Sequence, residues 1–350
     1  MPVTRWNSFS AFDPKKWRTA VGDSISPSSA SWERPIWSPE DASFEFPSRS
    51  IADPSEGNPW QLQESIHSSD QVLDSLLNGV AGLRLDASDC DMTWFDGVHM
   101  NMVELHVEPK LFHANKLDVR VLVEAGWRGS CGLDVTSAVG SAQMHDHWRM
   151  LDEAPHLRIW RFGSSDHRLR GLNLMEALVE HCLLLDHWLK WAKASDAVIE
   201  DELNRMVWRW WTSVDVMEEV AGLRALRALW SRWLAANQLD DQAVWIDAVT
   251  SDVTFRDELE TDHLIDLTVA SYAAIIGGAD GLETVPHIKS KSELPPDENA
   301  LRWARNIQHL MREEAGLHRT FDPMGGSRTV DRWSSNLLEA AWSAYLESKL

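Results

Sequence analysis

Short apolar runs alternate with amphipathic stretches from Trp60 to the end of the chain. Seven runs have the length and composition of buried strands, and Cys131–Thr136 is a weaker eighth candidate. The seven are Val80–Leu85, Met102–Val107, Val119–Val123, Leu157–Phe162, Met206–Trp211, Ala243–Val249 and Ala273–Ile276. Three stretches between them repeat apolar side chains every three or four residues, which predicts helices. These are Gln71–Asn78, Leu172–Ala192 and Val214–Leu234.

Short strands that alternate with helices predict parallel β-α-β units. Eight such strands are the number that closes a (β/α)8 barrel, and the chain from Trp60 onward has the usual length for that fold. We therefore predict an α/β protein in which residues 61–350 form a (β/α)8 TIM barrel.

Residues 1–60 differ from the rest because they are rich in serine and proline and have little periodicity. Only Phe9–Trp17 has the signals of a short helix, with Asp13 as its N-cap and Pro14 in its first turn. Large aromatic side chains nevertheless recur through the segment, which is unusual for a disordered tail. We predict an extended N-terminal arm that is ordered by contact, either with its own barrel or with a partner subunit.

The composition is that of a soluble globular protein, with 44% hydrophobic and 25% charged residues. No apolar run reaches the roughly 18–20 residues that span a bilayer, and the N-terminus lacks a signal-like core. Three widely spaced cysteines fit a reducing compartment, so the predicted location is cytoplasmic. A net charge of −21 argues against nucleic acid or an anionic membrane as a partner. The 20 tryptophans suit a packed core or a subunit interface.

Several motifs follow one another in an order that resembles a known family. The helical segment 218–230 reads E-E-V-A-G-L-R-A-L-R-A-L-W, and Thr250-Ser251 comes after the predicted seventh strand. Residues 273–327 contain an apolar run, the Gly-rich segment 277–281, a helix at 302–317 and the turn F-D-P-M-G-G-S. Together with Pro59–Leu62, these blocks resemble the barrel of the methylmalonyl-CoA mutase family.

That resemblance implies a radical 1,2-rearrangement of a CoA thioester, initiated by adenosylcobalamin. In the family the acyl-CoA enters along the barrel axis, and a separate C-terminal domain with a D-x-H-x-x-G loop carries the cobalamin. This chain has no such loop and ends at Leu350, shortly after a last predicted helix at Trp333–Leu346. We therefore expect no C-terminal cobalamin-binding domain.

Three other family motifs are altered. Active members have Gly-Tyr-His after a central strand, whereas this chain reads G-S-S-D at 163–166, so His167 comes two residues late and is at most a weak candidate. The tyrosine-containing substrate clamp is replaced by Ser48–Pro54, which has no tyrosine. The ribose-binding T-N-x-F-D-E segment is replaced by Thr284–Lys289, which lacks the amide and the acid.

The strand patterns add an independent expectation about the barrel interior. Alternate residues of a strand point to opposite faces. In Leu157–Phe162 and in Val207–Trp211, either phase places bulky side chains inside. An axial channel requires small inward side chains, so we expect a packed, closed barrel.

Two further patterns have simpler interpretations than a ligand site. The pair His145 and His147 has metal-ligand spacing but no third or fourth ligand nearby, so a surface loop is the better interpretation. The glycines at 277–281 lack the lysine and spacing of a phosphate loop, and we interpret them as a turn.

Together these features predict the non-catalytic small subunit of a heteromeric methylmalonyl-CoA mutase. We assign no catalytic, cofactor-binding or metal-binding residue to this chain. Adenosylcobalamin is expected on a catalytic large subunit, which would pair with this chain as a heterodimer. Two alternatives stay open: an active acyl-CoA mutase barrel whose cobalamin domain is a separate chain, or a homomeric scaffold.

Overall fold

The computed structural model describes the region that follows the N-terminal arm, with several gaps. The described residues are 57–85, 90–108, 117–135, 148–149, 151, 154, 156–163, 166–195, 197–253, 260–287 and 298–349, with only the backbone of 119, 134, 260 and 261. Residues 1–56 of the predicted arm, which include its short helix at 9–17 and the segment 48–54, lie outside these residues, as do the histidines at 145 and 147.

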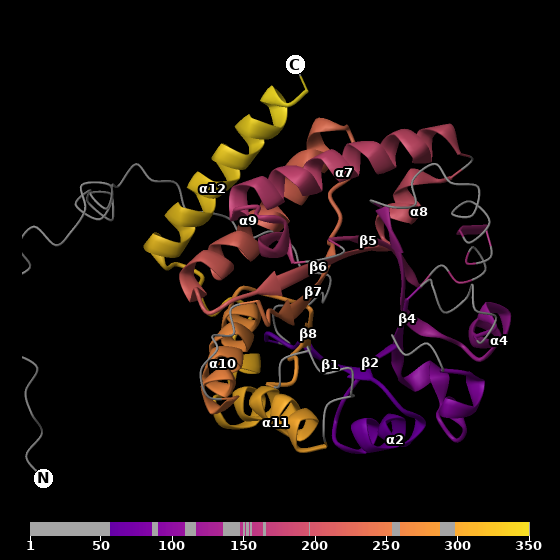
Figure 1. Cartoon of the computed structure of the whole chain (residues 1–350). Helices are drawn as coiled ribbons and strands as arrows, with labels where there is room; N and C mark the ends of the chain where they lie inside the picture. The colour runs from indigo at the N-terminus through magenta and orange to yellow at the C-terminus, as the bar shows by residue number, and fades with distance from the viewer. Residues whose placement is uncertain are drawn as a thin grey trace, which may run out of the picture. The chain divides into compact units, whose positions relative to one another are not determined.

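Eight parallel strands form a closed barrel in which each strand pairs with its sequence neighbours (Figure 1). The strands are β1 (Gln61–Ile66), β2 (Gly82–Leu85), β3 (Glu104–Val107), β4 (Arg128–Asp134), β5 (Arg158–Phe162), β6 (Met206–Thr212), β7 (Trp245–Thr250) and β8 (Gly281–Glu283). The barrel closes where β1 pairs with β8, with Gln61 opposite Gly281 and Gln63 opposite Glu283. This topology confirms the predicted (β/α)8 barrel.

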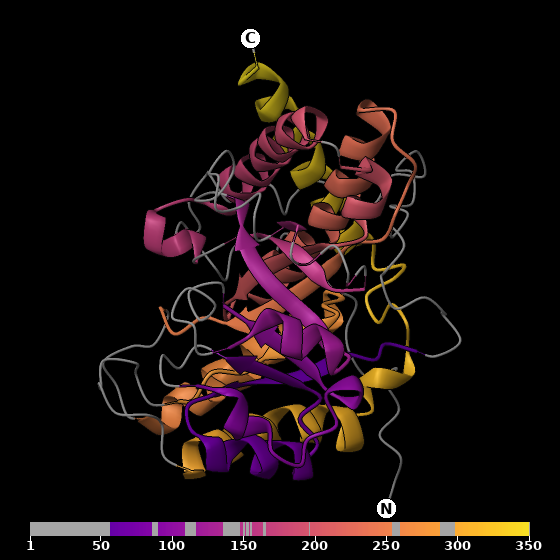
Figure 2. The same ribbon diagram turned by 90° about the vertical axis from the view of Figure 1, so that its right-hand side faces the viewer.

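Helices surround the barrel on its outer side. They are α2 (Ser69–Leu77), α4 (Val119–Glu124), α7 (Leu174–Ala194), α8 (Ile199–Leu203), α9 (Val216–Ala236), α10 (Glu260–Ile276), α11 (Glu298–His309) and α12 (Arg328–Glu347). Short helical turns lie at η5 (Met92–Phe95), η6 (Met100–Met102), η7 (His167–Arg170), η8 (Leu310–Glu314, a π-helix) and η9 (Leu317–Arg319). In both views α12 lies with α7 and α9 at one side of the barrel, and α10 lies with α11 at the other (Figures 1 and 2). Within the described residues, no helix has the length and apolarity needed to cross a membrane.

Two of the predicted strands are helical, so the predicted set of eight was wrong at those positions. Val119–Val123 belongs to α4, because the side chain of Asp118 caps the helix by accepting a hydrogen bond from the Arg120 amide at 2.9 Å. Ala273–Ile276 is the end of α10, and it is apolar all round because each of its residues is buried. The first and last strands of the barrel are instead Gln61–Ile66 and Gly281–Glu283.

The tryptophans of the strands fill the layer between the barrel and its helices. Trp208 and Trp210 of β6 and Trp160 of β5 are buried on the outer face of the barrel. Trp208 meets Trp230 of α9 edge to face at 5.8 Å, and Trp230 stacks on Trp233 at 6.1 Å. Aromatic contacts of this kind add to the free energy gained by burying apolar area. The outer layer is therefore the apolar core of the fold.

Candidate functional site

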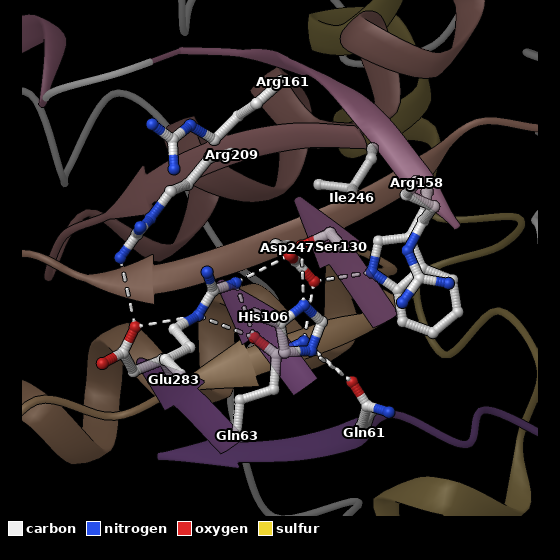
Figure 3. A network of polar contacts seen from close by, with 12 residues as sticks. Gln61, Gln63, His106, Ser130, Arg158, Arg161, Arg209, Ile246, Asp247 and Glu283 are labelled. Atoms are coloured by element: carbon white, nitrogen blue, oxygen red, sulfur yellow. Dashed lines mark hydrogen bonds and ion pairs between the residues drawn. The ribbon is translucent and has the colours of Figure 1, made fainter. Parts of the chain in front are cut away.

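The barrel axis is the place where the resemblance locates substrate binding, and in this chain it is lined by polar side chains. Every strand contributes at least one polar or charged residue to the interior (Figure 3). The set is Gln61, Gln63 and Ser65 from β1, Arg84, Glu104, His106, Ser130, Arg158, Arg161, Arg209, Asp247 and Glu283. Many of their contacts join strands that are not neighbours, and such contacts can form only through the interior of the barrel.

The centre of the axis is an ion pair between Arg84 of β2 and Asp247 of β7. Arg84 Nη2 donates to Asp247 Oδ2 at 2.7 Å, and both side chains are almost completely buried. Gln63 bridges them, because its Oε1 accepts from Arg84 Nη2 at 2.7 Å and its Nε2 donates to Asp247 Oδ1 at 2.8 Å. Trp245 Nε1 also donates to Asp247 Oδ1, at 2.6 Å. The central carboxylate is thus saturated with donors.

A second layer of ion pairs lies at the carboxyl ends of the strands. Arg209 of β6 reaches Glu283 of β8 at 3.2 Å, and Arg84 Nε lies 3.1 Å from the same carboxylate. Arg161 of β5 pairs with Glu108, which follows β3 and also lies 3.7 Å from Arg209. These contacts cross the mouth at which the catalytic residues of (β/α)8 enzymes are found.

A third layer lies at the amino ends of the strands. Arg158 of β5 pairs with Glu104 of β3, and its guanidinium lies over the ring of Trp245 at 3.9 Å from the centroid. His106 Nδ1 lies 2.8 Å from Ser130 Oγ, and its Nε2 lies 3.2 Å from Gln61 Oε1. A neutral imidazole satisfies both neighbours if Nε2 donates to Gln61 and Nδ1 accepts from Ser130.

Three inward positions are glycine, but network groups occupy the space beside them. A Cβ on Gly281 would lie 2.2 Å from Gln63 Nε2 and 2.5 Å from Asp247 Oδ1. A Cβ on Gly82 would lie 2.8 Å from Gln61 Oε1, and one on Gly132 would lie 2.6 Å from Arg161 Nη1. The small residues therefore make room for the side chains of the cross-axis network.

The interior is packed, as the strand patterns predicted, but its chemistry is different from the expected bulky packing. Trp160, Trp208 and Trp210 are buried on the outer face, whereas Trp211 and Trp245 contact the interior residues Arg209 and Asp247. The sequence contains a signal for this polar interior. In Gln61-x-Gln63-x-Ser65 and in Glu104-x-His106-x-Glu108, every second residue is polar, and such residues lie on one face of a strand.

The network sets the charge of each member. Burial would raise the pKa of Asp247, but the positive charge of Arg84 lowers this pKa well below the usual value. Burial likewise opposes ionisation of Glu104 and Glu108, yet Arg158 and Arg161 lower their pKa values. Burial and the charge of Arg84 lower the pKa of Arg209 to about 10, so it remains a cation at neutral pH.

His106 is the member of the axis whose protonation affects stability near neutral pH. Burial and the charge of Arg84 lower its pKa to about 3, whereas an unfolded histidine has a pKa of about 6.5. The unfolded chain therefore binds a proton that the folded chain does not, and stability falls as the pH decreases from about 6.5 toward 3.

We expect His106→Gln to lose less stability than the wild type when the pH is lowered from 7 to 5. The difference should be about 2 kcal/mol, because one proton is no longer linked to unfolding. Urea denaturation at a series of pH values would measure it. Parallel stability curves for the two proteins would show that His106 is not a buried neutral group.

The segment after β5 does not direct a histidine toward the axis. His167 lies in η7, and its ring packs against the outward-facing Trp210 at 5.3 Å. Burial and the neighbouring Arg168 lower the pKa of His167 to about 4. Asp166 is buried and accepts hydrogen bonds from Ser251 Oγ and from the Arg168 amide. The position that matches the family histidine, two residues before His167, is Ser165, which lies outside the described residues.

The segment after β8 is fixed by bonds to its own barrel. Thr284 Oγ1 lies 2.9 Å from Ser271 Oγ of α10, and the Val285 amide donates to Thr250 Oγ1 at 2.9 Å. His263 Nδ1 lies 2.9 Å from the carbonyl of His287. These hydroxyl groups are thus used within the fold, and residues 288–289 lie outside the described residues.

The helix that contributed most to the resemblance has a structural role. Glu219 accepts from Trp210 Nε1 at 3.1 Å and from Ser213 Oγ at 2.7 Å. Arg224 binds both oxygens of Asp322 at 2.7 and 2.8 Å, and Arg227 pairs with Asp280 at 2.6 Å. These side chains join α9 to β6, to the turn at 321–327 and to the start of β8.

Comparison with protein families agrees with this distribution of motifs. A family model described as "Methylmalonyl-CoA mutase" matches residues 187–348, which include α9, β6 to β8 and the 321–327 turn. Residues 187–348 are thus similar to the methylmalonyl-CoA mutase family. The buried contacts of Glu219, Arg224 and Arg227 lie within the matched segment.

The curated relatives that the chain resembles include proteins named methylmalonyl-CoA mutase small subunit and proteins named methylmalonyl-CoA mutase. The methylmalonyl-CoA mutase small subunit of Propionibacterium freudenreichii subsp. shermanii is 33% identical over 133 residues, which is 37% of this chain and 20% of the relative. The small subunit of Streptomyces virginiae is 33% identical over 151 residues, covering 43% of this chain and 24% of the relative. A protein of Cereibacter sphaeroides named methylmalonyl-CoA mutase is 27% identical over 176 residues, covering 49% and 24%. The alignments thus span a quarter or less of each relative.

A solved structure from Mycobacterium tuberculosis aligns with 73% of this chain and 93% of its own, at 11% identity. Its TM-score of 0.34 is too low to support a statement about shared fold, which rests here on the strand pairing.

Proposed function

We propose that this chain is a non-catalytic barrel subunit of an adenosylcobalamin-dependent mutase that acts on an acyl-CoA such as methylmalonyl-CoA. The substrate, the cofactor and the radical chemistry would belong to a catalytic large subunit. This chain would stabilise that subunit or provide its docking surface. Two of the similar relatives are named small subunits, which supports this assignment.

The observation that carries the proposal is the filled barrel axis. Mutase catalysis of the kind that the resemblance implies requires the extended arm of the CoA thioester to pass along the barrel axis. Here Arg84 of β2 and Asp247 of β7 meet across β1 and β8 at 2.7 Å, and Gln63 lies between them. A substrate could enter only if these buried, oppositely charged groups separated, which costs several kcal/mol for each ion left without its partner.

The two segments beyond the strand ends support the same conclusion. Ser251 Oγ donates to Asp166 beyond the strand ends, so both side chains are bonded within the barrel. The hydroxyl groups of Thr250 and Thr284 are bonded within the barrel, so they are not oriented to hold a ribose.

Two measurements on the purified chain test the absence of catalysis. With adenosylcobalamin and methylmalonyl-CoA, we expect no succinyl-CoA product and no rise in Tm. A ligand present at 100 times its Kd would stabilise the fold by about 2.7 kcal/mol, which a thermal shift would detect. Turnover by the chain alone, or such a rise in Tm with the CoA ester, would overturn the proposal in favour of an active barrel.

A further inference from the structure

Helices α10 and α11 present four large apolar side chains to solvent. Ile265 and Tyr272 of α10 are 65% and 39% exposed, and Trp303 and Leu310 of the α11 region are 39% and 58% exposed. Each pair is seven residues apart, which is close to two turns of a helix, so both members of a pair lie on the same face. The two helices pack side by side (Figures 1 and 2).

These side chains lie on the exposed faces of two helices that pack against each other. Trp303 faces α10, because its ring packs on His287 at 5.0 Å and the carbonyl of His287 is bonded to His263 of α10. Leu264 is half-buried and packs against the apolar cluster that contains Ile307 and Met311. We call the set Leu264, Ile265, Thr268, Tyr272, Trp303 and Leu310 the α10–α11 surface. The seven-residue spacing of its exposed apolar side chains suits the apolar face of one amphipathic helix, which repeats at positions i, i+3, i+4 and i+7.

The charges around the α10–α11 surface are mainly negative. The helices carry Asp262, Asp266, Glu298, Glu313 and Glu314, and the basic residue exposed on α11 is Arg302. Two copies of this surface would bring like charges together, and the chain as a whole has a net charge of −21. A second copy is therefore disfavoured, and an apolar helix with basic flanks is favoured.

We propose that the α10–α11 surface docks an amphipathic, basic-flanked helix of the mutase large subunit. This inference rests on the proposed function, because it names the face through which this chain and its catalytic partner would associate. Trp303 and Tyr272 supply the aromatic anchors that dominate interface energetics, and the surrounding carboxylates select the partner and speed its association.

The test uses the full-length chain and the large subunit encoded in the same genome. Ile265→Lys/Leu310→Lys places two charges on the α10–α11 surface, and we expect the Kd of the complex to rise by about 100-fold or more. Both side chains are exposed, so the Tm of the free variant should stay near that of the wild type. Leu346→Lys on α12 is the matched control, because Leu346 is also exposed and lies on the other side of the barrel. The control should bind with the wild-type Kd.

The possible outcomes separate the two proposals. If the wild type binds the large subunit and the double variant binds equally well, the docking surface is wrong while the proposed function stands. If the wild type does not bind the large subunit at all, both proposals fail. If the wild type forms homodimers that the double variant abolishes, the surface binds a second copy and the assignment to the large subunit is wrong.

Discussion

Asp247→Ala should destabilise the folded chain by about 3–5 kcal/mol, because it removes one of the two carboxylates that neutralise the buried guanidinium of Arg84 and leaves only Glu283 beside it. The side chains of Arg84 and Asp247 are 7% and 2% exposed, so water cannot replace the lost carboxylate. Gln63 and Trp245 also lose the acceptor for their N–H groups. A loss of this size is a large fraction of the stability of an ordinary domain.

Urea denaturation followed by far-UV circular dichroism would measure this loss. Glu339→Ala is a control for the removal of an exposed carboxylate that pairs with Arg232, and it should cost no more than about 1 kcal/mol. The double variant Arg84→Met/Asp247→Leu should recover most of the stability, because it removes both charges together. If the free energy of unfolding of Asp247→Ala lies within about 1 kcal/mol of the wild-type value, the axis is hydrated or the ion pair between Arg84 and Asp247 is not formed.

Arg227→Leu should cost a similar amount, about 3–5 kcal/mol, because it removes three buried interactions at once. Arg227 pairs with Asp280 at 2.6 Å and donates to the carbonyls of Val244 and Gly278 at 2.8 and 2.7 Å. Asp280 is fully buried and would keep the Ile246 amide as a donor, but it would lose the neutralising charge. The bond network that positions the starts of β7 and β8 would be disrupted.

The same helix offers a matched control for Arg227→Leu. Arg232→Leu makes the identical substitution on α9, but Arg232 is partly exposed and pairs with the exposed Glu339. Its expected cost is no more than about 1 kcal/mol. Equal effects of the two substitutions, measured by urea denaturation, would mean that burial does not decide the role of Arg227.

The segment 218–230, which carries much of the resemblance to the mutase family, could be recognised from the sequence, and the structure shows what its side chains contact. Glu219, Arg224 and Arg227 form buried bonds to three other parts of the barrel. Such residues are required for the fold whether or not the axis admits a substrate. The motif therefore predicted the barrel correctly and could not, by itself, predict catalysis.

The polar axis could not be predicted in the same way, because an arginine or a glutamate in a buried ion pair cannot be distinguished in the sequence from one on the surface. Arg158 and Arg161 are three residues apart on β5, yet both pair with interior carboxylates, because β5 is irregular between them: the amides of Ile159 and Trp160 both donate to the carbonyl of Arg205. Strict alternation would have placed them on opposite faces. Only the partners Glu104 and Glu108, which are more than fifty residues away, identify these positions as interior.

The two strand errors have a related cause. Ala273–Ile276 and Val119–Val123 are short apolar runs without a visible period, and such runs fit a buried helix as well as a strand. The true β8 is only Gly281–Glu283, which is too short to give a pattern of its own. The pairing of β8 with β1 and β7 defines it.

The balance of charge in the axis also limits how this barrel could change. Its described residues include four arginines (Arg84, Arg158, Arg161, Arg209) and four carboxylates (Glu104, Glu108, Asp247, Glu283) in one network. A single substitution of one of these residues by a smaller, uncharged residue leaves its partner buried without a counter-charge. This loss of stability precedes the opening of a passage wide enough for a substrate. A passage through the barrel could therefore return only by paired changes, each removing an acid and a base together. The closed axis would thus be entrenched in evolution, since each isolated step toward an open one lowers stability.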